Sequence, residues 1–204
     1  MKVAIVGGTG AFGRALAKRL AEAGEDDIVV GSRDAERAQA TAEELGVRGG
    51  LNHDVVGDVD LVVLAVKSNA TLSTATELAD AIGKTPVLCV ASDLRFTDAG
   101  VLPGRHQGSL AEEVARVVRA PIASGFQSFA AANVVEGHPG DALICGADSD
   151  AKTRALELAE RLGARGIDAG PLENSRALEG MTSVILNVNK RYKAHAGIHM
   201  TGLP

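Results

Sequence analysis

The sequence predicts an α/β fold built on a doubly wound, mostly parallel sheet. Strand-sized apolar runs alternate with segments of helical periodicity along the 204 residues. The apolar run Val3–Val6 has the pattern of a strand buried on both faces and stands almost at the start of the chain. A G-x-G-x-x-G sequence at Gly8, Gly10 and Gly13 follows directly and leads into an amphipathic helix that ends before Gly24. This order of strand, glycine turn and helix is typical of a Rossmann-type domain that binds a dinucleotide.

The glycine turn is the first predicted site. A tight turn from strand to helix needs backbone angles closed to side chains, and a pyrophosphate must come close to the backbone. The N-terminus of the helix then offers unpaired N–H groups and a partial positive charge. The alternative is a sterically required turn with no ligand. The expected cofactor contacts here are Gly8, Thr9, Gly10, Ala11, Phe12 and Gly13.

The second strand, Asp27–Val30, bears on the choice between NAD and NADP. NAD-specific domains usually end this strand with a carboxylate that binds the adenosine ribose. Here the strand runs into Gly31, Ser32 and Arg33, and Arg37 lies one helical turn further on. A hydroxyl and guanidinium groups suit a 2′-phosphate, so we predict NADP. The alternative is that Arg33 and Arg37 are surface residues paired with Asp34 and Glu36.

The next elements are a helix over Asp34–Leu45, a stretch of weak periodicity over 47–59, and a central strand over Leu61–Val66. Residues just past such a strand reach the nicotinamide ribose in doubly wound folds. The expected contacts at this tip are Val66, Lys67, Ser68 and Asn69. Ser68 or Asn69 is alternatively, or in addition, the cap of a helix over 70–82.

The middle of the chain continues with a strand over Pro86–Ala91, after which Ser92 is a further expected contact. An irregular stretch follows to Gln107. Ser109 and Glu112 form a capping-box sequence that opens a helix. A fifth strand covers Pro121–Phe126.

The segment Gly125–Asn133 combines small residues, two phenylalanines and polar side chains just past a strand. That composition suits a flat apolar ligand edged by a few hydrogen bonds. The alternative is a plain connection from strand to helix.

The last third predicts a strand over Asp141–Cys145, a helix over Ser149–Leu162, a strand over Gly166–Ala169 and a long C-terminal helix. We read these elements as a short αβα extension within one domain of residues 1–204. The part from about residue 120 adds the second-substrate pocket. The long apolar helix is a candidate for homodimer contact, or it covers its own sheet.

Composition argues against several function classes. A net charge of −5 and an aromatic content of 2% leave neither a basic stripe nor a stacking platform for nucleic acid. No segment reads as a signal peptide or a membrane span, so we expect a cytoplasmic protein. Cys89 and Cys145 lie in apolar runs and are expected to be buried free thiols. The five histidines share no convincing metal-ligand spacing, so no metal site is expected. They are His53, His106, His138, His195 and His199.

Three stretches together resemble a known family. They are Val3–Gly10, Val29–Arg33 and Asp168–Leu172, the last followed by Asn174–Arg176; Ala196–Ile198 continues the pattern. They resemble the F420H2:NADP oxidoreductases, also called NADPH-dependent coenzyme F420 reductases. The resemblance keeps its order along the chain.

The resemblance implies hydride transfer between C4 of the NADP nicotinamide and C5 of the deazaflavin F420, with the two ring systems stacked. Such a transfer needs no side-chain acid or base at the reacting carbon, so no catalytic residue is expected. Matching the family's 2′-phosphate set are Thr9, Ser32, Arg33 and Arg37, the last where relatives carry lysine. Within the segment that matches the deazaflavin pocket, the expected contacts are Gln127, Ser128, Phe129 and Ala130.

The chain departs from the family pattern on the side expected to bind the second substrate. The departures are the polar Lys67–Asn69 loop, Gln127, Ala130 and His199–Met200. Two alternative functions therefore stay open. One is an NADPH-dependent reductase of another small acceptor such as a cyclic imine, with Lys67 as proton donor. The other is an NADP-binding regulatory protein without turnover.

Overall fold

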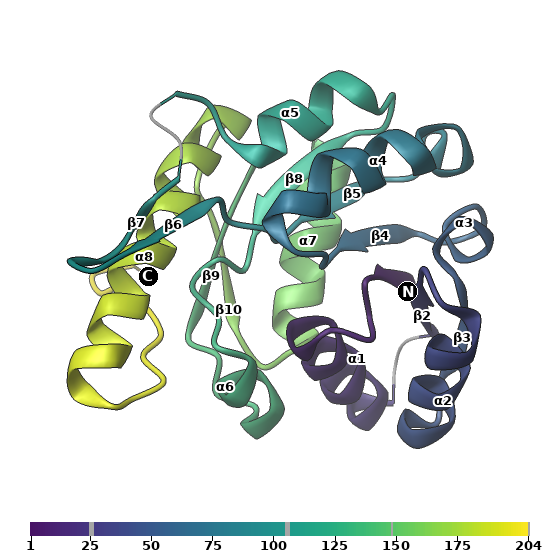
Figure 1. Ribbon diagram of the computed structural model, residues 1–204, viewed down its shortest axis with the longest axis horizontal. Helices are drawn as coiled ribbons and strands as arrows, with labels where there is room; N and C mark the ends of the chain where they lie inside the picture. The colour runs from purple at the N-terminus through teal and green to yellow at the C-terminus, as the bar shows by residue number, and fades with distance from the viewer. Residues whose placement is uncertain (25–26, 105–106, 148, 204) are drawn as a thin grey trace.

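The computed structural model describes residues 1–24, 27–104, 107–147 and 149–203. Its main feature is an eight-stranded sheet in the order β10-β9-β8-β5-β4-β1-β2-β3 (Figure 1). The strands of this sheet are β1 (Lys2–Val6), β2 (Asp27–Ser32), β3 (Arg48–Leu51), β4 (Leu61–Leu64), β5 (Val87–Cys89), β8 (Ile122–Gly125), β9 (Asp141–Gly146) and β10 (Arg165–Asp168). Every neighbouring pair is parallel except β8 and β9, which are antiparallel. The predicted doubly wound, mostly parallel α/β fold is confirmed.

Helices cover both faces of the sheet (Figure 1). They are α1 (Ala11–Ala23), α2 (Ala35–Leu45), α3 (Asn52–Val55), α4 (Ser68–Ile82), α5 (Leu110–Val117), α6 (Ala131–Glu136), α7 (Ser149–Arg161) and α8 (Ser175–Tyr192), with a 3-10 turn η1 (Leu172–Asn174) before α8. In β1, Val3 and Ile5 pack in one core with α1, α6 and α7. Ala4 and Val6 pack in a second core with α4 and α5. Because successive strand residues point to opposite faces, the unbroken apolar run of β1 fills both cores.

Two segments without clear periodicity contain strands that the sequence did not predict. The stretch 47–59 holds β3 and the short helix α3. In the stretch after Ser92, β6 (Leu94–Thr97) and β7 (Gly100–Pro103) form a two-stranded antiparallel hairpin. All three strands lie at sheet edges and are partly exposed, so none carries the continuous apolar run of a buried strand.

The interpretation of Ser68 or Asn69 as a helix cap is wrong. Both residues lie inside α4, which starts at Ser68, and no side chain caps this helix. The N-cap position belongs to Lys67. The helix is therefore two residues longer at its start than predicted.

The helix α8 lies with the β6–β7 hairpin at the opposite end of the molecule from α2 and β3 (Figure 1). Asn187 fastens the two together, because it accepts a hydrogen bond from the Val101 N–H at 3.0 Å and donates one to the Val101 carbonyl at 2.7 Å. Leu178 is the one apolar residue of α8 that is buried, with 5% of its surface exposed. Within the described ranges, no helix has the length and apolarity needed to cross a membrane.

Asp141, at the start of β9, holds the C-terminal segment against the sheet. Its carboxylate accepts hydrogen bonds from Arg165 at 2.7 Å and from the Met200 N–H at 2.6 Å. The Asp141 N–H donates to the Ile198 carbonyl at 2.8 Å. The Arg165 guanidinium, with the Met200 N–H, lowers the pKa of Asp141 below its usual value.

We predict that Asp141→Asn destabilises the protein more at neutral pH than in acid. A lowered folded-state pKa contributes stability above the unfolded pKa of about 4, and this contribution is lost as pH falls through the folded value. The expected loss at pH 7 is about 1 kcal/mol, since the Arg165 side chain is 40% exposed and water screens the pair. Denaturant unfolding of both proteins at pH 7 and pH 3 measures it. An equal difference at both pH values would contradict this role.

Candidate functional site

A cavity of about 700 Å³ lies at the carboxyl ends of β1, β2, β3 and β4. Its walls come from the residues that follow each strand. They are Gly7, Thr9 and Gly10 after β1; Ser32, Arg33, Asp34 and Arg37 at the end of β2 and beyond; Asn52 after β3; and Ala65, Val66, Lys67, Asn69, Ala70, Ser73 and Thr74 after β4. Open parallel sheets bind ligands at this edge.

The β1–α1 turn has the geometry of a phosphate-binding loop. The positive φ of +79° falls on Gly7, one residue before the predicted motif. A Cβ on Gly13 would lie 2.6 Å from the Gly7 carbonyl oxygen, so only glycine lets α1 pack against the turn. No side chain caps the N-terminus of α1, and its first turn holds no acidic residue. The free N–H groups and the helix dipole are therefore available to an anion.

Two guanidinium groups in the cavity wall have no partner among the described residues. Arg33 and Arg37 are exposed, and neither side chain forms a hydrogen bond or ion pair with any residue that the structure describes. Asp34 instead caps α2 by accepting a hydrogen bond from the Arg37 N–H at 3.1 Å. The described residues therefore do not show the pairing with Asp34 and Glu36 that the alternative supposed, although both arginines are surface residues, as it also supposed. Ser32 lies beside them, 6% exposed.

The tip of β4 supplies the other wall of the cavity. Val66, Lys67 and Asn69 line it, whereas Ser68 does not. The Lys67 side chain is exposed, and its ammonium has no ion-pair or hydrogen-bond partner in the described part of the chain. Three cations and one carboxylate among the described wall residues make the cavity suited to an anion.

Several predicted site residues lie outside this wall. They are Gly8, Ala11, Phe12, Gly13, Ser68, Ser92, Gln127, Ser128, Phe129 and Ala130. Gly8 and Gly13 are buried, Gly8 against β1 and β2 and Gly13 against the backbone of the turn. The Ser92 hydroxyl lies 2.8 Å from that of Thr182 on α8, and Thr182 donates to the Gln127 carbonyl at 3.1 Å. Thr182, which the sequence did not single out, thus joins the segments that follow β5 and β8.

The predicted second-substrate segment packs inward. Gln127 donates to the Ser124 hydroxyl at 2.8 Å and to the Cys89 carbonyl at 3.3 Å. The Ser128 hydroxyl donates to the Asp141 carbonyl at 3.2 Å. Phe129 stacks on Phe126 with ring centroids 4.9 Å apart, and Phe126 adopts a φ of +70° that is uncommon for a bulky residue. Backbone strain at this turn is the kind found at functional sites.

Sequence reasoning missed several residues of the cavity wall, of which Asn52 is the most informative. The others are Gly7, Asp34, Ala65, Ala70, Ser73 and Thr74. Asn52 follows β3, whose glycine-rich sequence hid the strand. Recognising a strand there would have placed Asn52 at the same edge as Arg33.

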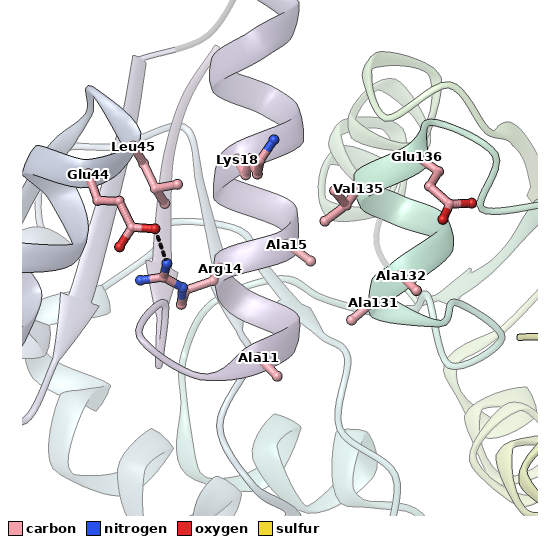
Figure 2. A pocket seen from close by; sticks show the side chains of 10 residues that line it. All are labelled: Ala11, Arg14, Ala15, Lys18, Glu44, Leu45, Ala131, Ala132, Val135 and Glu136. Atoms are coloured by element: carbon pink, nitrogen blue, oxygen red, sulfur yellow. Dashed lines mark hydrogen bonds and ion pairs between the residues drawn. The ribbon is translucent and has the colours of Figure 1, made fainter.

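A second hollow, of about 450 Å³, lies along α1 between α2 and α6 (Figure 2). Ala11 and Ala15 face Ala131 and Val135 across it. The two cations in the described wall are already paired: Arg14 with Glu44 at 2.5 Å, and Lys18 with Glu22 outside the hollow at 2.5 Å. This surface offers no free cation to a phosphate, so the cavity at the strand ends is the candidate site.

Nucleophilic and metal chemistry find little support in the described residues. Cys89 and Cys145 are free and buried, as predicted, and burial raises the pKa of each thiol to about 12. No cluster of three or more His, Cys, Asp or Glu residues suited to a metal occurs in the described ranges. His106 lies outside those ranges.

The chain is similar to named proteins over its full length. The family described as "NADP oxidoreductase coenzyme F420-dependent" matches residues 2–91. The F420-dependent NADP reductase of Methanothermobacter thermautotrophicus is 34% identical over 100% of this chain and 96% of its own. The reductase of the same name from Methanocaldococcus jannaschii is 34% identical, with 100% and 99% covered.

Solved structures share the fold. A protein from Arthrobacter sp. FB24, assigned provisionally as an F420-dependent NADP reductase, has a TM-score of 0.84 and 22% identity, with 96% of each chain covered. A pyrroline-5-carboxylate reductase from Coxiella burnetii has a TM-score of 0.60 and 18% identity over 94% of this chain and 70% of its own. The full-length identity to these two reductases places the chain in the family of F420-dependent NADP reductases.

Proposed function

We propose that this protein transfers a hydride between NADP(H) and the deazaflavin coenzyme F420. The observation that carries the proposal is the cavity at the strand ends, whose unpaired arginines and uncapped helix suit a phosphorylated dinucleotide. Relatives aligned over the whole chain are named F420-dependent NADP reductases. The protein is accordingly an oxidoreductase that uses both molecules.

Different residues of the cavity bind different parts of the dinucleotide. The β1–α1 turn, from Gly8 to Gly13, and the α1 N-terminus bind the pyrophosphate through backbone N–H groups. Ser32, Arg33 and Arg37, with Thr9, bind the 2′-phosphate through charge-assisted hydrogen bonds. The guanidinium groups support this role, because no ion pair with a described residue must break before phosphate binds.

The nicotinamide end is assigned to the tips of β4 and β5. The nicotinamide riboside is held by residues that follow these strands, namely Val66, Lys67, Ser68, Asn69 and Ser92. The segment Gln127–Ala130 forms the wall against which the deazaflavin stacks. NADPH supplies the hydride when bound. The protein orients the two rings and excludes water, which requires no acid or base at the reacting carbon. Residues 1–204 act as one NADP-binding domain, in which the part from about 120 supplies the second pocket.

A stopped-flow mixture of protein, NADPH and F420 tests the function. The F420 absorbance band should bleach as the deazaflavin is reduced, and the nicotinamide absorbance should fall at the same rate. If NADPH binds but only a cyclic imine such as pyrroline-5-carboxylate is reduced, the protein is a reductase of another acceptor. Binding of NADPH with no turnover of either acceptor would indicate a regulatory protein.

We also propose that the protein is a homodimer joined through α8 and the β6–β7 hairpin. Large apolar side chains are exposed on both: Phe96 and Leu102 on the hairpin, and Val184, Val188 and Tyr192 on α8. Phe96 and Tyr192 are each 74% exposed. Because α8 packs against β7, these side chains belong to adjoining elements, and adjoining exposed apolar groups favour a partner surface.

Val184→Glu should convert the dimer into a monomer. Val184 is 60% exposed at the middle of α8, so a carboxylate there would be buried without a partner in the dimer while costing the monomer little. Size-exclusion chromatography with light scattering gives the mass of each. Thr153→Glu, at an exposed position of α7, is the matched control. A monomeric wild type, or an unchanged Val184→Glu dimer, would contradict the assignment.

The cytoplasmic location and the absence of nucleic-acid binding stay predictions.

A further inference from the structure

Asn52 occupies a defined place at the adenosine side of the cavity. It begins α3 immediately after β3, and β3 pairs with β2 in parallel so that Leu51 lies beside Ser32. The next residue on each strand is therefore Asn52 on one and Arg33 on the other. Both line the same cavity. Asn52 is nevertheless buried, with only 8% of its surface exposed.

The side-chain amide of Asn52 forms no hydrogen bond within the described part of the chain. Its carbonyl oxygen Oδ1 is fully buried and unpaired, and the amide makes no hydrogen bond with any other described residue. Burying an unpaired amide is unfavourable, and such groups in folded proteins call for a functional explanation. Two other described residues, Arg19 and Gln127, have unpaired buried polar atoms, but neither lines this cavity.

The neighbouring strand leaves room for this amide. A Cβ on Gly31 of β2 would lie 2.7 Å from Oδ1 of Asn52, so any larger residue at position 31 would displace the side chain. No hydrogen bond from a described residue fixes either end of the amide. Oδ1 lies buried beside Gly31 in the structure, and rotation about χ2 would exchange it with the Nδ2 donor, so either end can be turned toward a ligand in the cavity.

We propose that Asn52 binds the adenosine end of the dinucleotide and contributes to the selection of NADP over NAD. An anionic 2′-phosphate selects the orientation in which Nδ2 donates a charge-assisted hydrogen bond. A neutral amide adds this donor next to Arg33 and Arg37 without adding a third positive charge. The inference rests on the proposed function, since it assigns one more residue to the same NADP site.

Isothermal titration of the full chain with NADPH and NADH tests the proposal, using Asn52→Leu and Asn52→Asp. Leucine has the shape of asparagine without its polar atoms, and we expect its NADPH dissociation constant to rise about 10-fold or more. NADH binding should change less than about threefold. Asn52→Asp should lose more NADPH affinity than Asn52→Leu, because its carboxylate repels the phosphate.

Thermal unfolding without ligand distinguishes a loss of NADPH binding from a loss of fold stability. Because the amide is unpaired, Asn52→Leu should unfold at the wild-type temperature or higher. His53→Ala is the control. The His53 side chain, next to Asn52 in the sequence, is 73% exposed and lies outside the cavity wall, so its removal should change neither NADPH affinity nor the unfolding temperature.

Wild-type NADPH affinity in Asn52→Leu would overturn the inference, as would equal losses of NADPH and NADH accompanied by a lower unfolding temperature. The proposed function would survive either result if wild-type protein still binds NADPH and reduces F420. Failure of the wild type to bind NADPH would overturn both.

Discussion

Arg33→Ala should weaken NADPH binding by about 1.5–3 kcal/mol while hardly changing NADH binding. The Arg33 guanidinium lines the cavity and has no ion-pair partner within the described structure, so its positive charge is available to the 2′-phosphate. NADH lacks that phosphate. The loss should therefore be selective for the phosphorylated cofactor.

Isothermal titration with both cofactors measures the selectivity. Arg48→Ala is the matched control. Arg48 is the first residue of β3, the strand next to β2, but its guanidinium pairs with Asp27 at 2.6 Å and lies outside the cavity wall. It removes the same charge and should leave both affinities unchanged. Equal losses of NADPH and NADH in Arg33→Ala would mean that Arg33 supports the fold instead of binding phosphate.

Among substitutions that add one methyl group to the β1–α1 turn, Gly13→Ala should lower stability and cofactor affinity most. Its Cβ would lie 2.6 Å from the Gly7 carbonyl oxygen and 2.7 Å from the Gly8 Cα, and both obstacles are backbone atoms. Either α1 moves away from β1 or the turn opens. Overpacking of this kind costs about 1–3 kcal/mol of unfolding free energy. Because the turn itself is displaced, NADPH and NADH should lose affinity together.

Denaturant unfolding and titration with both cofactors test this expectation. In the control Gly57→Ala, the added Cβ would meet its nearest neighbour, the Ala81 carbonyl oxygen, at an ordinary 3.7 Å, so stability and affinity should stay near wild type. Gly13→Ala with wild-type stability and affinity would show that close packing of α1 on the turn is not needed. The different selectivity of Arg33→Ala and Gly13→Ala distinguishes the phosphate on the ribose from the pyrophosphate.

The buried strands and the glycine turn could be predicted because their causes are local. Val3–Val6 is apolar at every position, and β1 extends this run by only one residue. The same holds for Ser32, which ends β2, and for Arg33, which follows it; both reach the cavity. In each case the residues that determine the structure are neighbours in the sequence.

β3 could not be predicted because its sequence reflects a neighbour that is distant in the chain. A Cβ on Gly49 would lie 2.6 Å from the Ala38 carbonyl oxygen on α2, so the strand needs glycine where a strand pattern would show an apolar residue. The position of Asn52 depends on that hidden strand. Its missing hydrogen bonds become visible only in three dimensions.

The segment after β8 shows the same limit in a different form. Its composition suggested a ligand pocket, but composition does not indicate which way a side chain turns. Gln127 and Ser128 donate hydrogen bonds to groups inside the protein, and Phe129 lies against Phe126. These orientations depend on Ser124 and Asp141, which belong to two different strands.

The hydroxyl of Thr182 has a mechanical consequence. It bonds both the Ser92 side chain and the Gln127 backbone, so the loops from two strands are anchored to a single point on α8. Loops fixed in this way cannot drift apart independently. A planar ring that binds beside these loops therefore meets one rigid surface, and the loops lose less conformational entropy when it binds.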